Sequence, residues 1–186
     1  MALEQLVTAD QLEQLHRPDL ELVRGVLVPV MTPAGGEHGA LAALLAMELG
    51  AFVRARRLGR VYVEVGYKIF SNPDTVRGPD LSFVSTGREA AASYRRGFIH
   101  GAPDLAIEIV SQDRTLEQLT AKAREYLQAG TLLVWVVDPP SRAVRVHQPG
   151  RRVVTLSEDG TLDGGVVLPG LTLPLTQLFA DMAPED

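Results

Sequence analysis

The sequence contains no cysteine, which excludes disulfide bonds, thiolate metal sites and cysteine nucleophiles. It also lacks an uninterrupted apolar run of membrane-spanning length, and it begins with neither a basic leader nor a small-residue cleavage site. We therefore expect a cytoplasmic protein without a membrane partner. Its 186 residues, without repeat or interdomain linker, are most simply a single domain over 1–186.

Lysine is almost absent, since two lysines, Lys68 and Lys122, stand against sixteen arginines. Lysine has a compact ammonium with a tunable pKa, which suits catalytic sites, so both lysines are candidates for a site. The net charge of −5 argues against a general nucleic-acid coat protein, although an enzyme acting locally on DNA can be acidic overall. Two arginine clusters, at 54–60 and 95–96, are more typical of solvated helix ends than of a binding patch.

The order of predicted elements indicates an α/β domain with a mixed sheet. We expect a helix over 3–16, a hairpin over 20–31, a helix over 37–57, strands over 61–70 and 79–85, a polar connection over 86–101, a strand over 103–111, a helix over 114–128, a strand over 132–138, and a C-terminal β extension. The helix between the two apolar strands fits a right-handed crossover. Strands 103–111 and 132–138 should therefore be parallel and interior.

The stretch "APDLAIEIVSQD" places an acid, Glu108, inside an apolar strand. A buried carboxylate is costly without a partner, which here could be a cation, a proton or a metal. If strands 79–85 and 103–111 are neighbours, Asp80 and Glu108 converge at one end of the sheet. Two carboxylates in an apolar setting repel, and Mg²⁺, with its preference for oxygen ligands, is a natural solution.

Lys122 borders the apolar stripe of the helix over 114–128, so it could reach back over the sheet to Glu108. Lys68 is the second candidate, on a predicted strand face that it shares with Glu64. Glu64 itself is a weaker metal candidate and is more typical of a solvated strand residue. From the residues alone, a Glu108–Lys122 ion pair without any chemistry is an equally open interpretation.

Several longer motifs resemble the Uma2 family, also called DUF820, of the PD-(D/E)XK nuclease superfamily. They are "LELVRGVLV", "GGEHGALAALL", "RGPDLSFVS", "APDLAIEIVSQDRTLEQLTAKAREYLQAGTLLVWVVDPPSRAVRVHQP" and "LDGGVVLPGLTLPLTQLF". The resemblance runs over nearly the whole chain. It implies a restriction-endonuclease-like αβββαβ core with an N-terminal helix and hairpin and a C-terminal β extension, and the activity of a metal-dependent phosphodiester hydrolase.

The resemblance also assigns roles to particular residues. Asp80 matches the PD aspartate, and Glu108 matches the acidic residue of the (D/E)XK strand. Together with the main-chain carbonyl of Ile109, these two carboxylates would bind Mg²⁺ or Mn²⁺. The bound ion would activate a water. Val110 stands where the motif has its lysine, which makes Lys122 on the following helix the match and leaves the activity of the site open.

Three further residues are candidates for the surroundings of this site. His38, at the start of the helix over 37–57, would contact phosphate or adjust a ligand, although a core or capping histidine is the simpler interpretation. Glu37 on the same helix could bind metal, and Arg77, beside the PD strand, would steer phosphate.

Two functions follow from these residues. The first is an endonuclease that hydrolyses phosphodiester bonds of nucleic acid, with DNA as the expected substrate, by metal-activated water. The second is a non-catalytic nuclease-fold module that binds DNA or protein, with Glu108–Lys122 as a structural ion pair. We also expect a homodimer, because cutting duplex DNA needs two sites and the C-terminal strands offer an edge for pairing.

Overall fold

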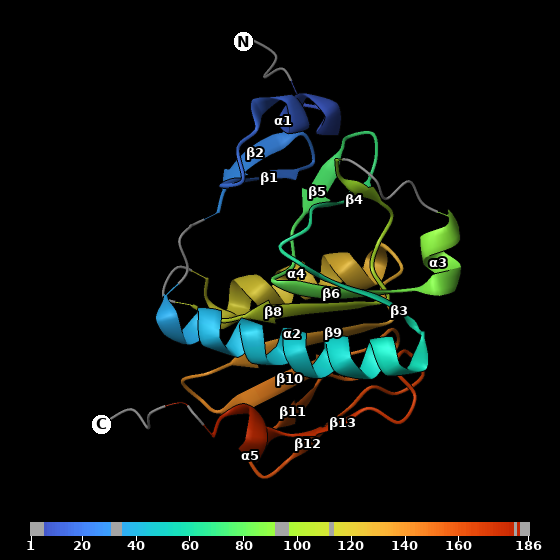
Figure 1. Ribbon diagram of the computed structural model, residues 1–186. Coiled ribbons are helices and arrows are strands. Elements are labelled where there is room, and N and C mark those ends of the chain that lie inside the picture. Colours follow the sequence, from blue (N-terminus) through green and yellow to red (C-terminus); the bar gives the residue numbers. More distant parts are fainter. Residues whose placement is uncertain (1–5, 31–34, 92–96, 112–113, 181, 183–186) are drawn as a thin grey trace.

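The computed structural model describes residues 6–30, 35–91, 97–111, 114–180 and 182 (Figure 1). Along the chain its elements are α1 (Ala9–Leu15), β1 (Leu20–Val23), β2 (Val26–Pro29), α2 (Gly36–Arg56), β3 (Gly59–Val63), β4 (Tyr67–Phe70), β5 (Thr75–Arg77), β6 (Leu81–Ser85), α3 (Thr86–Ala91), β7 (Ile99–His100), β8 (Leu105–Ile109), α4 (Leu116–Gln128), β9 (Leu133–Asp138), β10 (Ala143–His147), β11 (Val154–Leu156), β12 (Thr161–Asp163), β13 (Thr172–Pro174) and α5 (Leu175–Leu178).

The central sheet has six strands in the order β11-β10-β9-β8-β6-β3. Strands β3, β6 and β8 are antiparallel neighbours, while β8 and β9 are parallel and joined through α4. All residues of β8 and β9 are buried, as expected for interior strands. The predicted mixed sheet and the αβββαβ order, formed by α2, β3, β6, β8, α4 and β9, are confirmed.

Helices cover both faces of this sheet. Helix α2 covers one face. Its apolar stripe packs in one cluster with the side chains of residues 105, 107 and 109 of β8; the stripe consists of Leu41, Leu45, Leu49 and Val53. Helix α4 covers the opposite face, where it packs on Ala106 of β8. Because side chains alternate along a strand, Glu108 points to the side of α4. This alternation is the reason that α4, and not α2, supplies the partners of Glu108.

A second sheet, in the order β2-β1-β5-β4-β7, lies beyond one end of the central sheet with α1 against it (Figure 1). The hairpin predicted over 20–31 is confirmed by the pairing of β1 with β2 over Leu20–Pro29, and residue 31 lies outside the described residues. Helix α1 begins at Ala9, behind a capping box on Thr8, and not at residue 3. Residues 3–5 of that prediction, and the Arg95–Arg96 cluster, lie outside the described residues.

The prediction of one strand over 61–70 is wrong. Strand β3 ends at Val63, because Glu64 takes a left-handed conformation with a φ of 52°. Gly66 then passes so close to Phe98 that a Cβ on it would lie 2.4 Å from Phe98 Cδ1. The chain therefore leaves the central sheet here and continues as β4 in the second sheet, so Glu64 and Lys68 do not share a strand face.

Helix α2 is, among the described residues, the one helix that is long and apolar enough to cross a membrane by length and composition alone. Core helices pass the same test. The burial of Leu41, Leu45, Leu49 and Val53 against the sheet matches the core role that the spacing predicts for this helix.

Candidate active site

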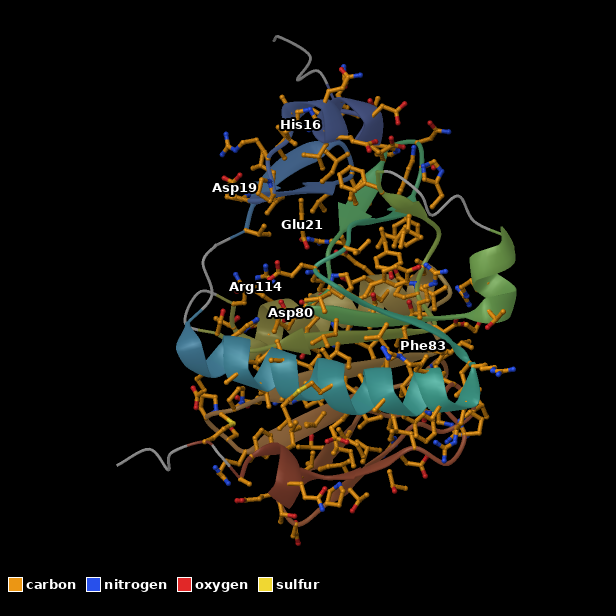
Figure 2. The ribbon with its side chains drawn as sticks, in the orientation of Figure 1. His16, Asp19, Glu21, Asp80, Phe83 and Arg114 are labelled. Atoms are coloured by element: carbon orange, nitrogen blue, oxygen red, sulfur yellow. The ribbon has the colours of Figure 1, made fainter. Side chains whose placement is uncertain are left out.

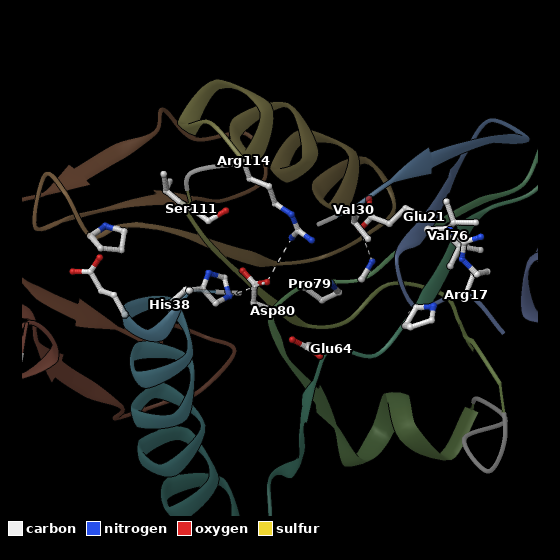
Figure 3. Close-up of a pocket in the computed structure, with 18 of the residues that line it drawn as sticks. Arg17, Glu21, Val30, His38, Glu64, Val76, Pro79, Asp80, Ser111 and Arg114 are labelled. Atoms are coloured by element: carbon white, nitrogen blue, oxygen red, sulfur yellow. Dashed lines mark hydrogen bonds and ion pairs between the residues drawn. The ribbon is translucent and has the colours of Figure 1, made fainter. Parts of the chain in front are cut away.

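A cleft of about 560 Å³ lies between the two sheets, at the end of the central sheet where Asp80 stands (Figure 3). Its walls include Glu21 from β1, His38 from α2, Val110 just after β8 and Arg114 just before α4. Figure 2 shows Glu21, Asp80 and Arg114 in the region between the two sheets. Residues from distant parts of the sequence therefore meet at one opening.

Asp80 directly precedes β6 and is 7% exposed. The register Leu81↔Ile107 brings it beside Glu108, which confirms that these two strands are neighbours. Its Oδ2 accepts a hydrogen bond from the Ile109 N–H at 2.6 Å. Its Oδ1 lies 3.5 Å from His38 Nε2 and 3.5 Å from Arg114 Nη1. One oxygen of Asp80 is thus held by the backbone, and the other faces the His38 imidazole and the Arg114 guanidinium.

Glu108 is fully buried, and its two oxygens have different surroundings. Oε1 lies 2.8 Å from Lys122 Nζ and accepts a hydrogen bond from the Tyr126 hydroxyl at 2.9 Å. Oε2 has no hydrogen-bond partner within the described part of the chain, and Arg114 Nη1 lies 3.5 Å from it. Burial raises the pKa of Glu108 to about 7, against the lowering effect of the Lys122 charge.

Lys122 reaches Glu108, as the helical spacing predicted. Its Nζ lies 2.8 Å from Glu108 Oε1 and 2.7 Å from Glu21 Oε1, and it donates a hydrogen bond to the Gly78 carbonyl at 2.9 Å. Burial alone would lower the pKa of Lys122, but the charges of Glu108 and Glu21 raise it above its ordinary value. Three acceptors match the three protons of an ammonium, so this side chain is held in one position.

Sequence reasoning missed three residues of the site: Glu21, Arg114 and Tyr126, whose hydroxyl donates to Glu108. Glu21 is 6% exposed and binds Lys122, Arg77 Nη1 at 2.7 Å and the Gly78 N–H at 2.9 Å. It interrupts the apolar hairpin strand "LELV" just as Glu108 interrupts its own strand, so the same signal could have identified it. Arg114 has no such signal, because a charged residue just before a helix is ordinary.

Three of the remaining predicted residues line the cleft. His38 is 12% exposed in its side chain, and the Asp80 carboxylate raises the pKa of His38 above its ordinary value. Glu37 also lines the cleft but is solvent-exposed. Glu64, the weaker metal candidate, is exposed at the cleft wall, and its N–H donates to the Asp80 carbonyl.

The other two predicted residues are engaged elsewhere. Arg77 donates two hydrogen bonds to Glu125, at 2.8 and 2.9 Å, and one to Glu21, so its guanidinium is committed to an ion-pair network. Lys68 Nζ lies 2.8 Å from Asp74 Oδ2 in the second sheet and does not line the cleft. These contacts orient neighbouring structure rather than a substrate.

The donor set fits a hard divalent ion. No group of three or more histidine, aspartate or glutamate side chains that could hold a metal is found in the described ranges. Mg²⁺, however, is usually bound through one or two carboxylates together with waters and substrate phosphates. Asp80 Oδ1 and Glu108 Oε2 both lie 3.5 Å from the same Arg114 nitrogen, so two carboxylate oxygens face one position suited to a cation.

The buried Glu21 carboxylate should make stability depend on pH. Burial alone would raise its pKa, but Lys122 and Arg77 lower the pKa of Glu21 to about 2. Because this pKa is lower in the folded chain than in the unfolded chain, Glu21 stabilises the folded state at pH values above the unfolded pKa of about 4.5. This contribution is lost as pH falls toward 2. We expect Glu21→Gln to be less stable than wild type at pH 7 by on the order of 3 kcal/mol.

Urea unfolding of both proteins from pH 7 to pH 2 measures this difference. The gap in the free energy of unfolding should close as pH falls from about 4.5 to about 2. Parallel profiles for the two proteins would contradict the assigned role of Glu21.

Comparison with known proteins matches the chain to a family model and to solved structures. The family model Uma2, described as "Putative restriction endonuclease", matches residues 8–176. A solved structure, described as "a putative nuclease belonging to DUF820 from Anabaena variabilis ATCC 29413", superimposes with a TM-score of 0.81 at 24% sequence identity, over 94% of this chain and 98% of that one. No functionally curated protein matches the sequence. The structural likeness confirms the restriction-endonuclease-like fold.

Proposed function

This chain belongs to the Uma2 family, and from that membership we propose that it is a divalent-metal-dependent endonuclease that hydrolyses phosphodiester bonds of DNA. One observation supports the site above all others. Asp80 and Glu108 each use one carboxylate oxygen in a fixed internal contact and direct the other toward a common position. Such an arrangement is suited to an ion shared between two carboxylates.

Asp80 and Glu108 would hold Mg²⁺ or Mn²⁺, with the main-chain carbonyl of Ile109 as a further proposed ligand. When bound, the ion would lower the pKa of a coordinated water and neutralise charge on the scissile phosphate. The Ile109 N–H orients Asp80 through Oδ2. Lys122 and Tyr126 orient Glu108 through Oε1. The protein thus directs Asp80 Oδ1 and Glu108 Oε2 toward one position without rearrangement of these carboxylates.

Lys122 performs the role of the (D/E)XK lysine, whose place in the motif corresponds to position 110 of this chain. Val110 leaves an apolar side chain at the cleft wall, and the ammonium enters instead from α4. Because Glu21, Glu108 and the Gly78 carbonyl occupy its protons, Lys122 acts by orienting Glu108 and by its positive field. That field favours hydroxide over water beside it.

A non-catalytic module is the second candidate, and the Glu108–Lys122 ion pair favours it. The pair accounts for Glu108 Oε1 but leaves Oε2 buried without a hydrogen-bond partner in the described residues. An unpaired buried carboxylate oxygen is costly, and a structural ion pair alone gives no reason to keep it. Metal binding therefore distinguishes the two functions.

A phosphate-bearing substrate, which we propose is DNA, is supported by positive groups at the cleft. His38 and Arg114 line it, and α2 begins there at Gly36 behind Gly35, which supplies no capping side chain. Helix N-termini of this kind attract phosphate. We place the enzyme in the cytoplasm, where such a substrate is available.

A homodimer remains part of the proposal, because duplex cleavage needs two active sites. Strand β11 is an edge of the central sheet, and Val153 and Val154 beside this edge are 49% and 53% exposed. Sedimentation of wild type and Val154→Lys tests this pairing. A wild-type dimer that dissociates in the variant is expected, and a wild-type monomer would contradict it.

Cleavage of supercoiled plasmid, single-stranded DNA and RNA with Mg²⁺, Mn²⁺ or EDTA tests the function. Metal-dependent cutting of DNA, abolished by EDTA, is the expected result. Absence of cutting in every condition, with no metal bound in calorimetry, would favour the non-catalytic module.

A further inference from the structure

Arg114 occupies the position between the two carboxylates that a cation would take. Its Nη1 lies 3.5 Å from Asp80 Oδ1 and 3.5 Å from Glu108 Oε2, at the end of the cleft shown in Figure 3. Both distances exceed those of an ordinary hydrogen bond. This nitrogen is buried and has no hydrogen-bond partner within the described ranges. The contact is therefore electrostatic, without the geometry of a fixed ion pair.

The Arg77 guanidinium provides a contrast within the same protein. Arg77 uses Nε, Nη1 and Nη2 in hydrogen bonds to Glu125 and Glu21, and its side chain is 12% exposed. The Arg114 side chain is 21% exposed and lines the cleft. Arg77 is fixed by bidentate hydrogen bonds. Within the described residues, Arg114 makes ion-pair contacts without a side-chain hydrogen bond, and it lines the cleft.

The backbone at Arg114 is anchored on both sides. Its N–H and carbonyl pair with Ser111, each at 3.3 Å. The next residue, Thr115, caps α4 through a capping box with Gln118. The side chain can therefore change position without any movement of the helix that carries Lys122.

We propose that Arg114 is an internal cation that the catalytic metal displaces, and that the released guanidinium binds the substrate phosphate in the cleft. This inference rests on the proposed function. A divalent ion and a guanidinium repel each other too strongly to share one position between Asp80 and Glu108. A phosphate, in turn, offers the guanidinium the bidentate hydrogen bonds that these two carboxylates do not.

The exchange makes metal and substrate binding mutually dependent. Without phosphate, the metal must separate Arg114 from both carboxylates, which weakens its binding. With phosphate in the cleft, Arg114 has another anion to bind, so the carboxylates are freed for the metal. By linkage, bound metal strengthens phosphate binding by the same factor.

Calorimetry with Mn²⁺ alone tests the displacement in the full chain. Arg114→Gln should bind Mn²⁺ about tenfold more tightly than wild type, because no internal cation opposes the metal. Cleavage by the same variant should fall about 100-fold, because a charge that stabilises the phosphate is lost. Arg17→Gln is the matched control: Arg17 lines the same cleft but pairs with Asp19, so its loss should leave Mn²⁺ affinity within about twofold of wild type.

A second measurement uses the wild type and does not depend on the folding of a variant. A crystal structure with Mn²⁺ bound at Asp80 and Glu108 should show the Arg114 guanidinium withdrawn from between them. An unmoved guanidinium beside the bound metal would overturn the displacement. Tighter metal binding without loss of cleavage in Arg114→Gln would overturn the phosphate contact.

The two proposals fail in different ways. Equal or weaker Mn²⁺ binding by Arg114→Gln, with clear binding by wild type, overturns the displacement and leaves the nuclease function standing. An absence of Mn²⁺ binding in both proteins overturns both proposals.

Discussion

Glu108→Gln is expected to lower metal-dependent cleavage by about 10³-fold, the largest loss for any single change in the site. The substitution removes the negative charge at Oε2, the oxygen that has no internal hydrogen-bond partner among the described residues. It keeps an oxygen that can accept from Tyr126 and Lys122. These contacts should let the variant fold, with stability lower by about 3–5 kcal/mol because Lys122 loses one of its charge partners. Its loss of activity should come from lost metal binding.

Plasmid cleavage and Mn²⁺ calorimetry on the same preparation measure both effects. Glu48→Gln is the control, because it replaces a carboxylate by an amide in the same way, but on the exposed side of α2 and away from the cleft. It should cut at the wild-type rate. Retained cleavage in Glu108→Gln would remove Glu108 from the metal site and leave only its structural ion pair.

Lys122→Met is expected to reduce both activity and stability. The apolar side chain fills a similar volume but leaves the buried carboxylates of Glu21 and Glu108 without the ammonium that bridges them. Breaking a buried ion pair from one side costs about 3–5 kcal/mol. Since the Lys122 charge lowers the pKa of Glu108, its removal should also raise that pKa above its value of about 7. A larger share of Glu108 is then protonated at neutral pH, and we expect cleavage to fall about 100-fold or more.

The sign of the pH effect follows from the raised pKa of Glu108. A carboxyl with a folded pKa above its unfolded value binds an extra proton in the folded state between the two pKa values, so the free energy of unfolding falls as pH rises from about 4.5 to about 7. In Lys122→Met this loss should extend to higher pH than in wild type. Thermal unfolding between pH 5 and pH 9 measures it.

The second lysine of the chain offers a matched control. Lys68→Met makes the same substitution at a 19% exposed side chain that pairs with Asp74 outside the cleft. It should cost about 0–1 kcal/mol and leave cleavage near the wild-type rate. Equal losses from the two substitutions would mean that Lys122 has no special part in the site.

These experiments distinguish two requirements that Glu108 meets at once. Its Oε1 completes the internal cluster with Lys122 and Tyr126, which allows the carboxylate to be buried. Its Oε2 faces the cation position together with Asp80. The ion pair and the proposed metal site are therefore compatible, because each uses a different oxygen.

The sequence by itself determined the core of this fold. Strict alternation along 105–109 and the helical spacing of 116–128 decide locally which side chains face inward. Those local periods, with the right-handed crossover rule, predicted the parallel pair β8 and β9 and the reach of Lys122 from the following helix. The approach of Asp80 to Glu108 followed only on the condition that their strands are neighbours, which the register confirms. The motifs around them also indicated the family that the comparison confirmed.

The tertiary structure alone decided which distant side chains complete the site. Glu21 reaches Lys122 only because the hairpin of the second sheet folds over the end of the central sheet. The crossing of the chain from the central sheet to the second sheet also separates Glu64 from Lys68. It occurs where Glu64 takes its left-handed backbone conformation. Local periodicity fixes the face on which a side chain lies, but it carries no information about which element packs against that face. Ion pairs between separate elements, including those of Arg114, therefore emerge only when the chain is folded.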